Sequence, residues 1–234
     1  MLKKEIKGKD FFDKFPQFYS SSPNGDLKSR LHDRFDAIFL NGNTDFSKKT
    51  VLDLAAHDGR WSWAARFMGA NHVTAVEINP IHLEAYSNNM AAIEFDTKWY
   101  SLIQDDVVHF LESSNAKFDL VLCLGWFYHT TYQIDVIKHL ALITNEMLVL
   151  DTECINDSES AYFKVRLNKD HSLSSYTESF TQIPSLACIR LLLGYYGFKY
   201  TEYNWANNIS CHDECSDYAE SRRATFFCTK KIQS

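Results

Sequence analysis

Residues 51–80 read V-L-D-L-A-A-H-D-G-R-W-S-W-A-A-R-F-M-G-A-N-H-V-T-A-V-E-I-N-P, and this stretch decides the fold. It begins with an apolar run around Asp53, which is typical of a strand buried on both faces. A loop of small and polar residues ends at Gly59, and helical apolar spacing follows over residues 61–68. Residues 72–78 return to a strand pattern that ends at Glu77. This order of strand, loop, helix, strand and acid predicts a nucleoside site at the carboxyl edge of a parallel sheet.

The alternation of strands and helices continues along the chain. Apolar runs and helical spacing predict helices at 80–93, 107–112, 134–142 and 185–197, and strands at 98–103, 118–124, 146–151, 198–205 and 223–230. Strands that alternate with helices form a parallel sheet with right-handed crossovers and helices on both faces. The sequence therefore predicts an α/β fold.

Two regions lie outside this alternation. Residues 1–44 contain interleaved aromatic side chains and an amphipathic helix over 27–40, so we expect an amino-terminal helical extension that folds over the site as a lid. Residues 152–184 are polar and show no clean periodicity, which is typical of a functional insert or of disorder. We therefore expect residues 45–234 to form the main domain, with a cap insert at about 152–184.

Composition narrows the classes of function. The chain has 234 residues, 45% of them hydrophobic, which suits one decorated α/β domain. Its net charge of -6 argues against a nucleic-acid partner. No apolar run would span a membrane and the amino terminus lacks an apolar signal region, so we expect a cytoplasmic protein. We expect it to be a monomer or a homodimer. Cys211 and Cys215 are close enough to share a metal, but no second ligand pair has zinc-site spacing, so we expect no metal.

Acidic residues follow three of the predicted strands. Glu77 can accept hydrogen bonds from a ribose diol, and Asp105 or Asp106 can accept one from an adenine amine. Asp53 can hold the amides of the loop or meet a ligand's ammonium group. Structural alternatives remain open: Asp53 as a loop cap, Glu77 as a solvent-facing strand end, and the aspartate pair as a helix N-cap.

This pattern resembles the class I S-adenosylmethionine-dependent methyltransferases over residues 45–153. The resemblance implies a Rossmann-like, seven-stranded, mostly parallel sheet whose final strand is antiparallel. It implies S-adenosylmethionine as cofactor, bound by Asp53, Ala55, Ala56, His57, Gly59, Glu77, Ile78, Asp105, Asp106, Leu124, Gly125 and Trp126. The family's loop commonly reads G-x-G-x-G, whereas this chain has A-A-H-D-G at 55–59. A pyrophosphate needs those glycines more than S-adenosylmethionine does, so the loop weighs against a dinucleotide-dependent oxidoreductase.

The segment L-G-W-F-Y-H-T-T at 124–131 is similar to the transfer-RNA wobble-uridine carboxymethyl-transferring enzymes. That resemblance places Tyr128 and His129 at the transfer site. His129 as a plain helix-start residue is the structural alternative. A base is needed only if the acceptor must lose a proton, and His57, Asp151 and Glu153 are further candidates.

The leading hypothesis is methyl transfer from S-adenosylmethionine to a small-molecule acceptor, such as a sugar or a secondary metabolite, by in-line displacement. The first alternative is modification of transfer RNA, indicated by residues 124–131. The second is a catalytically silent module that binds S-adenosylmethionine and works through partners, indicated by the altered loop at 55–59.

Overall fold

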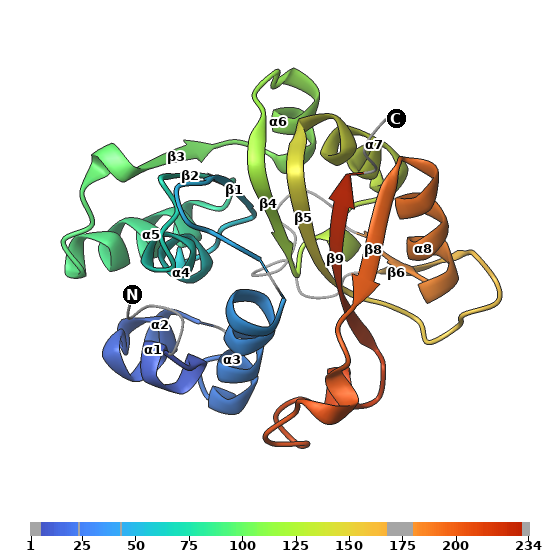
Figure 1. The fold of residues 1–234 in the computed structure, drawn as a ribbon, viewed down its shortest axis with the longest axis horizontal. Helices are drawn as coiled ribbons and strands as arrows, with labels where there is room; N and C mark the ends of the chain where they lie inside the picture. The colour runs from blue at the N-terminus through green and yellow to red at the C-terminus, as the bar shows by residue number, and fades with distance from the viewer. Residues whose placement is uncertain (1–5, 23, 43, 168–179, 231–234) are drawn as a thin grey trace.

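A computed structural model describes residues 6–22, 24–42, 44–167 and 180–230 of the chain. Its centre is a seven-stranded sheet in the order β3-β2-β1-β4-β5-β9-β8 (Figure 1). The strands are β1 (Thr50–Leu54), β2 (His72–Glu77), β3 (Tyr100–Gln104), β4 (Phe118–Leu124), β5 (Thr144–Glu153), β8 (Phe198–Glu202) and β9 (Arg223–Lys230). Only β9 runs antiparallel to its neighbours β5 and β8 in this sheet. The prediction of a mostly parallel, Rossmann-like sheet with an antiparallel final strand is confirmed.

Helices cover both faces of the sheet, as predicted. They are α4 (Arg60–Phe67), α5 (Pro80–Ala92), α6 (Val107–Ser113), α7 (Gln133–Ile143) and α8 (Leu186–Tyr195), with shorter helices η2 (Thr97–Trp99), η3 (Phe127–His129), η4 (Trp205–Asn207) and α9 (Ser216–Ala219). Successive side chains of a strand point to opposite faces. Leu52 thus joins a core with α6, α7 and α8, whereas Val51 joins a second core with α4 and α5.

The amino-terminal residues form a helical layer on the second core. They comprise α1 (Gly8–Lys14), α2 (Gln17–Ser21), α3 (Lys28–Phe35) and the π-helix η1 (Asp36–Asn41), drawn in blue in Figure 1. The ring of Phe11 stacks on Phe35 at 4.6 Å between centroids, and Phe12 meets Trp61 of α4 edge-on at 6.0 Å. The aromatic residues of this segment therefore fill a core against the sheet domain. Service as a lid stays a prediction.

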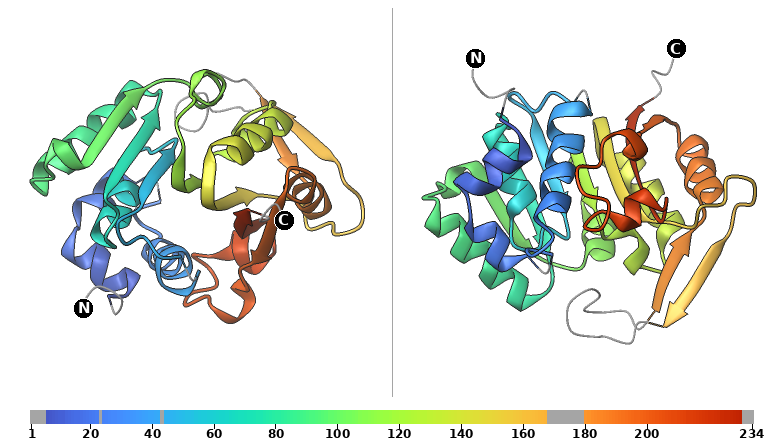
Figure 2. Two further views of the ribbon diagram at one scale, coloured as in Figure 1. Left: turned by 45° about the horizontal axis from the view of Figure 1, so that its top comes forward. Right: turned by 90° about the horizontal axis from the view of Figure 1, so that it is seen from below.

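The segment after β5 is more regular than its sequence suggested. β6 (Phe163–Leu167) and β7 (Phe180–Pro184) form an antiparallel hairpin beside the main sheet, in yellow and orange in Figure 2. Our expectation of no periodicity was wrong here, because residues 163–167 alternate apolar and polar side chains. Val165 and Leu167 are nonetheless exposed, so this alternation does not mark a buried face. Residues 168–179 of the predicted cap lie outside the described residues.

Candidate functional site

The carboxyl ends of the parallel strands meet at one edge, which gathers the predicted cofactor residues. Leu54 at the end of β1 pairs with Cys123 of β4, and Glu77 at the end of β2 pairs with Gln104 of β3. The amide of Asp105 donates to the carbonyl oxygen of Glu77 at 3.2 Å, which joins the ends of β2 and β3. The edge therefore carries the loop at 55–59, the acids after β2 and β3, and the segment after β4.

Glu77 is a buried carboxylate with hydrogen-bonding capacity to spare. Its Oε2 accepts from the amide of His57 at 2.9 Å and its Oε1 from the amide of Asn79 at 2.8 Å. Burial alone would raise the pKa of Glu77, but the neighbouring His82 ring and these two amides lower it below its usual value. Each oxygen of a carboxylate can accept a second hydrogen bond. A charged Glu77 at this edge therefore fits a ribose diol, and its alternative as a solvent-facing strand end is wrong, since the residue is only 5% exposed.

The loop at 55–59 is held in place by hydrogen bonds from α4 and α2. Ala55 and His57 have positive φ angles of 53° and 54°, and Gly59 has 82°. Asp58 is fully buried and accepts hydrogen bonds from Arg60 Nε at 2.7 Å and from Ser21 Oγ of α2 at 2.6 Å. The amino-terminal layer therefore reaches the loop directly and helps to fix its shape.

All three predicted aspartates have partners within the protein. Asp53 is buried and accepts a hydrogen bond from Ser62 Oγ of α4 at 2.6 Å, and burial raises its pKa to about 7. Asp106 is the N-cap of α6, where its Oδ1 accepts from the amides of Val108 and His109. The cap interpretation of Asp106 thus holds, and a contact of either residue with a cofactor stays a prediction. Asp105 is half-buried at the end of β3, with its carboxylate 2.8 Å from Nδ1 of His109.

The segment after β4 turns sharply and then forms η3. Gly125 has a φ of 94°, and the rings of Tyr128 and His129 lie 4.0 Å apart. His129 is 8% exposed, and its Nδ1 has no hydrogen-bond partner among the described residues. Burial, followed by the positive charges of Arg223 and Arg166, lowers the pKa of His129 to about 3. His129 is therefore an uncharged imidazole with an unused nitrogen in η3, and its place at the transfer site stays a prediction.

A buried ion-pair network beside Gly125 escaped the sequence analysis. Asp151 of β5 accepts hydrogen bonds from Arg34 of α3 at 3.1 Å, Arg223 of β9 at 3.0 Å and Tyr218 of α9 at 2.8 Å. Burial alone would raise the pKa of Asp151, but the two guanidinium groups lower it to about 2. Asp151 is thus a charged structural anchor whose two oxygens are engaged by the network, which argues against it as the base.

The network also borders the site. A Cβ atom placed on Gly125 would lie 3.7 Å from Nη1 of Arg223 and 3.8 Å from Nη2 of Arg34. Glu153, another candidate base, lies within 3.2 Å of Arg166 on the β6–β7 hairpin. These partners are far apart in the chain, and no local pattern in the sequence signals them.

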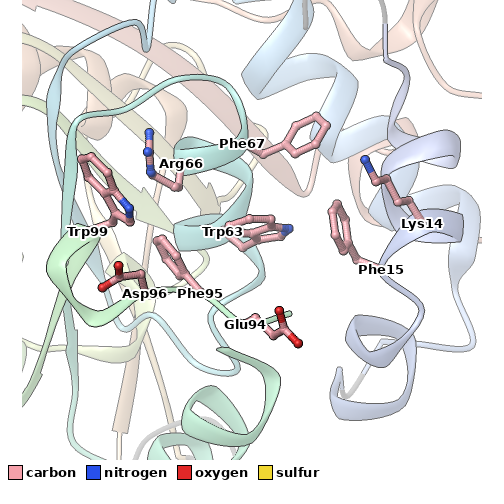
Figure 3. Close-up of a pocket in the computed structure, with 9 residues that line it drawn as sticks. All are labelled: Lys14, Phe15, Trp63, Arg66, Phe67, Glu94, Phe95, Asp96 and Trp99. Atoms are coloured by element: carbon pink, nitrogen blue, oxygen red, sulfur yellow. The ribbon is translucent and has the colours of Figure 1, made fainter. Parts of the chain in front are cut away.

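A groove lies outside this edge (Figure 3). The groove has a volume of about 490 Å³ and is lined by Lys14, Phe15, Trp63, Arg66, Phe67, Glu94, Phe95, Asp96 and Trp99. Residues 94–99 precede β3, so the groove belongs to the amino ends of the strands. No predicted cofactor residue lines it.

The six cysteines are free thiols, and five of them are buried. The thiol of Cys215 is buried and donates to Asp33 Oδ2 at 3.4 Å, and burial raises its pKa to about 12. Within residues 6–22, 24–42, 44–167 and 180–230, no three His, Cys, Asp or Glu side chains gather as a metal site. Over the same residues, no helix has the length and apolar character needed to cross a membrane.

Residues 51–145 match the family model described as a methyltransferase domain. A ribosomal protein L11 methyltransferase of Fusobacterium nucleatum is 28% identical over 79 residues, which make up 34% of this chain and 25% of that protein. The matched part thus spans about a quarter of the length of that relative.

Two solved structures share the fold. The N-terminal domain of EvdMO1, crystallised in the presence of SAH and D-fucose, has a TM-score of 0.63 and 15% identity over 86% of this chain and 82% of that chain. Magnesium protoporphyrin IX methyltransferase from Synechocystis PCC 6803, with bound SAM, has a TM-score of 0.61 and 16% identity over 95% of each chain. Residues 51–145, which include β1 to β4, are thus similar to a methyltransferase domain, and the fold is shared with two structures described with SAH or SAM.

Proposed function

We propose that this chain transfers the methyl group of S-adenosylmethionine to a small-molecule acceptor, a sugar or a secondary metabolite, by in-line displacement. The observation that carries the proposal is the buried, charged Glu77 at the same sheet edge as the Gly125–His129 segment. The N-terminal domain of EvdMO1 was crystallised with D-fucose, which supports a sugar-like acceptor for a chain of the same fold.

Three residues at the carboxyl edge of the sheet would contact the ribose, the adenine and the sulfonium of the cofactor. Glu77 would hold the ribose diol, and Asp105 would accept from the adenine amine. Trp126, half-buried after β4, would lie beside the sulfonium, because aromatic faces attract cations. When bound, S-adenosylmethionine supplies a methyl group activated by the positive charge on its sulfur.

The acceptor side would be formed by Tyr128 and His129. A neutral His129 can take a proton from a hydroxyl group of the acceptor, but a pKa of about 3 makes it a weak base. Positioning can by itself supply about 7–11 kcal/mol of barrier reduction when reacting groups are held in line. We therefore assign most of the rate acceleration to alignment of the acceptor.

Calorimetry with S-adenosylmethionine and S-adenosylhomocysteine tests the proposal. We expect Glu77→Ala to abolish measurable binding, because a charged, buried acceptor is lost. Glu112→Ala is the matched control, since Glu112 is an exposed glutamate on α6. Binding that survives Glu77→Ala would remove the proposed cofactor site. Transfer of labelled methyl groups to a panel of sugars and metabolites then separates an enzyme from a silent binding module.

A second candidate function is methylation or carboxymethylation of transfer RNA. The adjacent rings of Tyr128 and His129 after β4, in the segment resembling transfer-RNA enzymes, favour it. The net charge of -6 disfavours it. An electrophoretic shift with bulk transfer RNA across a salt series decides the matter, and absence of salt-sensitive binding would eliminate this candidate.

A further inference from the structure

The loop at 55–59 carries side chains where its backbone favours glycine. Ala55 and His57 both lie in the left-handed region, with φ angles of 53° and 54°. Residues with a Cβ atom seldom adopt this region, and such strained positions gather at functional sites. Glycine would relieve the strain at either position. The imidazole at position 57 is therefore present at the expense of backbone strain, and its contacts indicate what it does.

The backbone of His57 contacts the carboxylate that is proposed to hold the ribose, and its ring packs on a second histidine beside that carboxylate. It stacks on the ring of His82, with 3.7 Å between centroids and 30° between planes. His82 is 7% exposed, and its Nδ1 lies 3.6 Å from Oε1 of Glu77. The backbone amide of His57 donates to the other oxygen of Glu77. Glu77 is thus flanked by both histidines.

The hydrogen bonds of His57 fix which of its ring nitrogens carries the proton. Nη2 of Arg60 lies 3.1 Å from Nδ1 of His57. A guanidinium group has donors only, so Nδ1 must accept, and the proton of the neutral ring sits on Nε2. Burial, followed by the charge of Arg60, lowers the pKa of His57 to about 4, which keeps the ring neutral.

Part of this ring pair is available to a ligand. The side chain of His57 is 24% exposed, and its Nε2–H is the donor that Arg60 does not engage. Nε2 of His82 is buried and has no hydrogen-bond partner among the described residues. The pair therefore combines a partly exposed donor with an unpartnered buried nitrogen beside Glu77.

We propose that the imidazole of His57, supported by His82, is a second recognition element for the ribose of S-adenosylmethionine, donating from Nε2 to a ribose oxygen. This inference rests on the proposed function. Glu77 accepts hydrogen bonds and His57 donates one, so together they match the hydrogens and the lone pairs of the sugar. A glycine at position 57 would leave only backbone groups for this task.

Calorimetry with two probes tests this role. S-adenosylhomocysteine is the demethylated cofactor, with both its adenosine and its amino-acid half. 5'-Methylthioadenosine keeps the adenosine but lacks the amino-acid half. We expect His57→Gly to weaken the binding of both by about tenfold, the usual effect of one hydrogen bond lost from a partly buried site. Ala55→Gly relaxes the same loop at nearly the same φ without removing an imidazole, so its effect on affinity measures loop stiffness alone and should be smaller than that of His57→Gly. Thermal melting verifies that each variant is folded.

A third variant separates hydrogen bonding from loop stiffness. Asparagine tolerates the left-handed region and keeps a donor on a shorter side chain, so His57→Asn should give an intermediate affinity. Equal loss in Ala55→Gly and His57→Gly would assign the effect to loop stiffness and overturn the proposal. Loss for S-adenosylhomocysteine alone would place His57 at the amino-acid half, and would overturn the ribose assignment.

The proposed function and this inference fail in distinguishable ways. Absence of binding by the unmodified chain would remove both. Binding by the unmodified chain that His57→Gly leaves unchanged would remove only the role of His57.

Discussion

The buried carboxyl group of Asp53 makes the stability of this protein depend on pH in a direction unusual for an aspartate. Asp53 is 1% exposed, and burial raises its pKa from 3.8 to about 7 in spite of the hydrogen bond from Ser62. In the folded chain Asp53 keeps its proton up to about pH 7, whereas in the unfolded chain it loses the proton near pH 3.8. The stability that it contributes is thus complete below about pH 3.8 and is lost as the pH rises through about 7.

The size of the effect follows from the same shift. One pKa unit corresponds to about 1.4 kcal/mol, so titration of Asp53 removes up to about 3 kcal/mol of unfolding free energy between about pH 5 and pH 8. Asparagine has the shape of a protonated carboxyl group and does not titrate. Asp53→Asn should therefore gain stability relative to the unmodified chain as the pH rises, by about 1–3 kcal/mol over this range.

Urea unfolding at several pH values between about 5 and 8 measures this difference. Every other ionisable group is present in both proteins, so its contribution cancels in the comparison. Asp119→Asn is the control, because hydrogen bonds from the amide and hydroxyl of Thr50 lower the pKa of Asp119 below its usual value. Its difference from the unmodified chain should stay constant over this range. A constant difference for Asp53→Asn as well would refute the protonated state of Asp53.

Three further predictions concern stability. Arg34→Met leaves the buried Asp151 short of a partner and should cost about 3–5 kcal/mol by urea unfolding; a loss below about 1 kcal/mol would contradict the anchor role of the network. Gly59→Ala puts a Cβ atom 2.6 Å from the side chain of Met90 at a φ of 82°, and should lower the unfolding free energy by about 2–4 kcal/mol in a thermal melt; an unchanged melting temperature would show that the loop relaxes freely. Ser21→Ala removes the hydroxyl that donates to Asp58, so we expect a loss of about 1–2 kcal/mol and faster hydrogen exchange in the 55–59 amides; unchanged exchange would mean that α2 does not support the loop.

The local signals for element boundaries were reliable because each depends on neighbouring residues. Pro80 occupies the first turn of α5, and Ser185 caps α8 by accepting from the amide of Cys188. Gly69 follows α4 with a φ of 111°, a conformation in which glycine commonly ends a helix. The hairpin β6–β7 was missed although residues 163–167 alternate in polarity; Val165 and Leu167 are exposed, whereas Ile183 on β7 is buried.

The sequence by itself determined the order of strands and helices and the row of acids at strand ends, because period and strand direction place Glu77 and Asp105 at one edge of any parallel sheet. Only the tertiary structure decided what each polar group does there. It joined Asp151 to Arg34 across 117 residues and laid the ring of His57 on His82. A single side chain's charge and partners depend on contacts between distant segments, and no local pattern encodes those contacts.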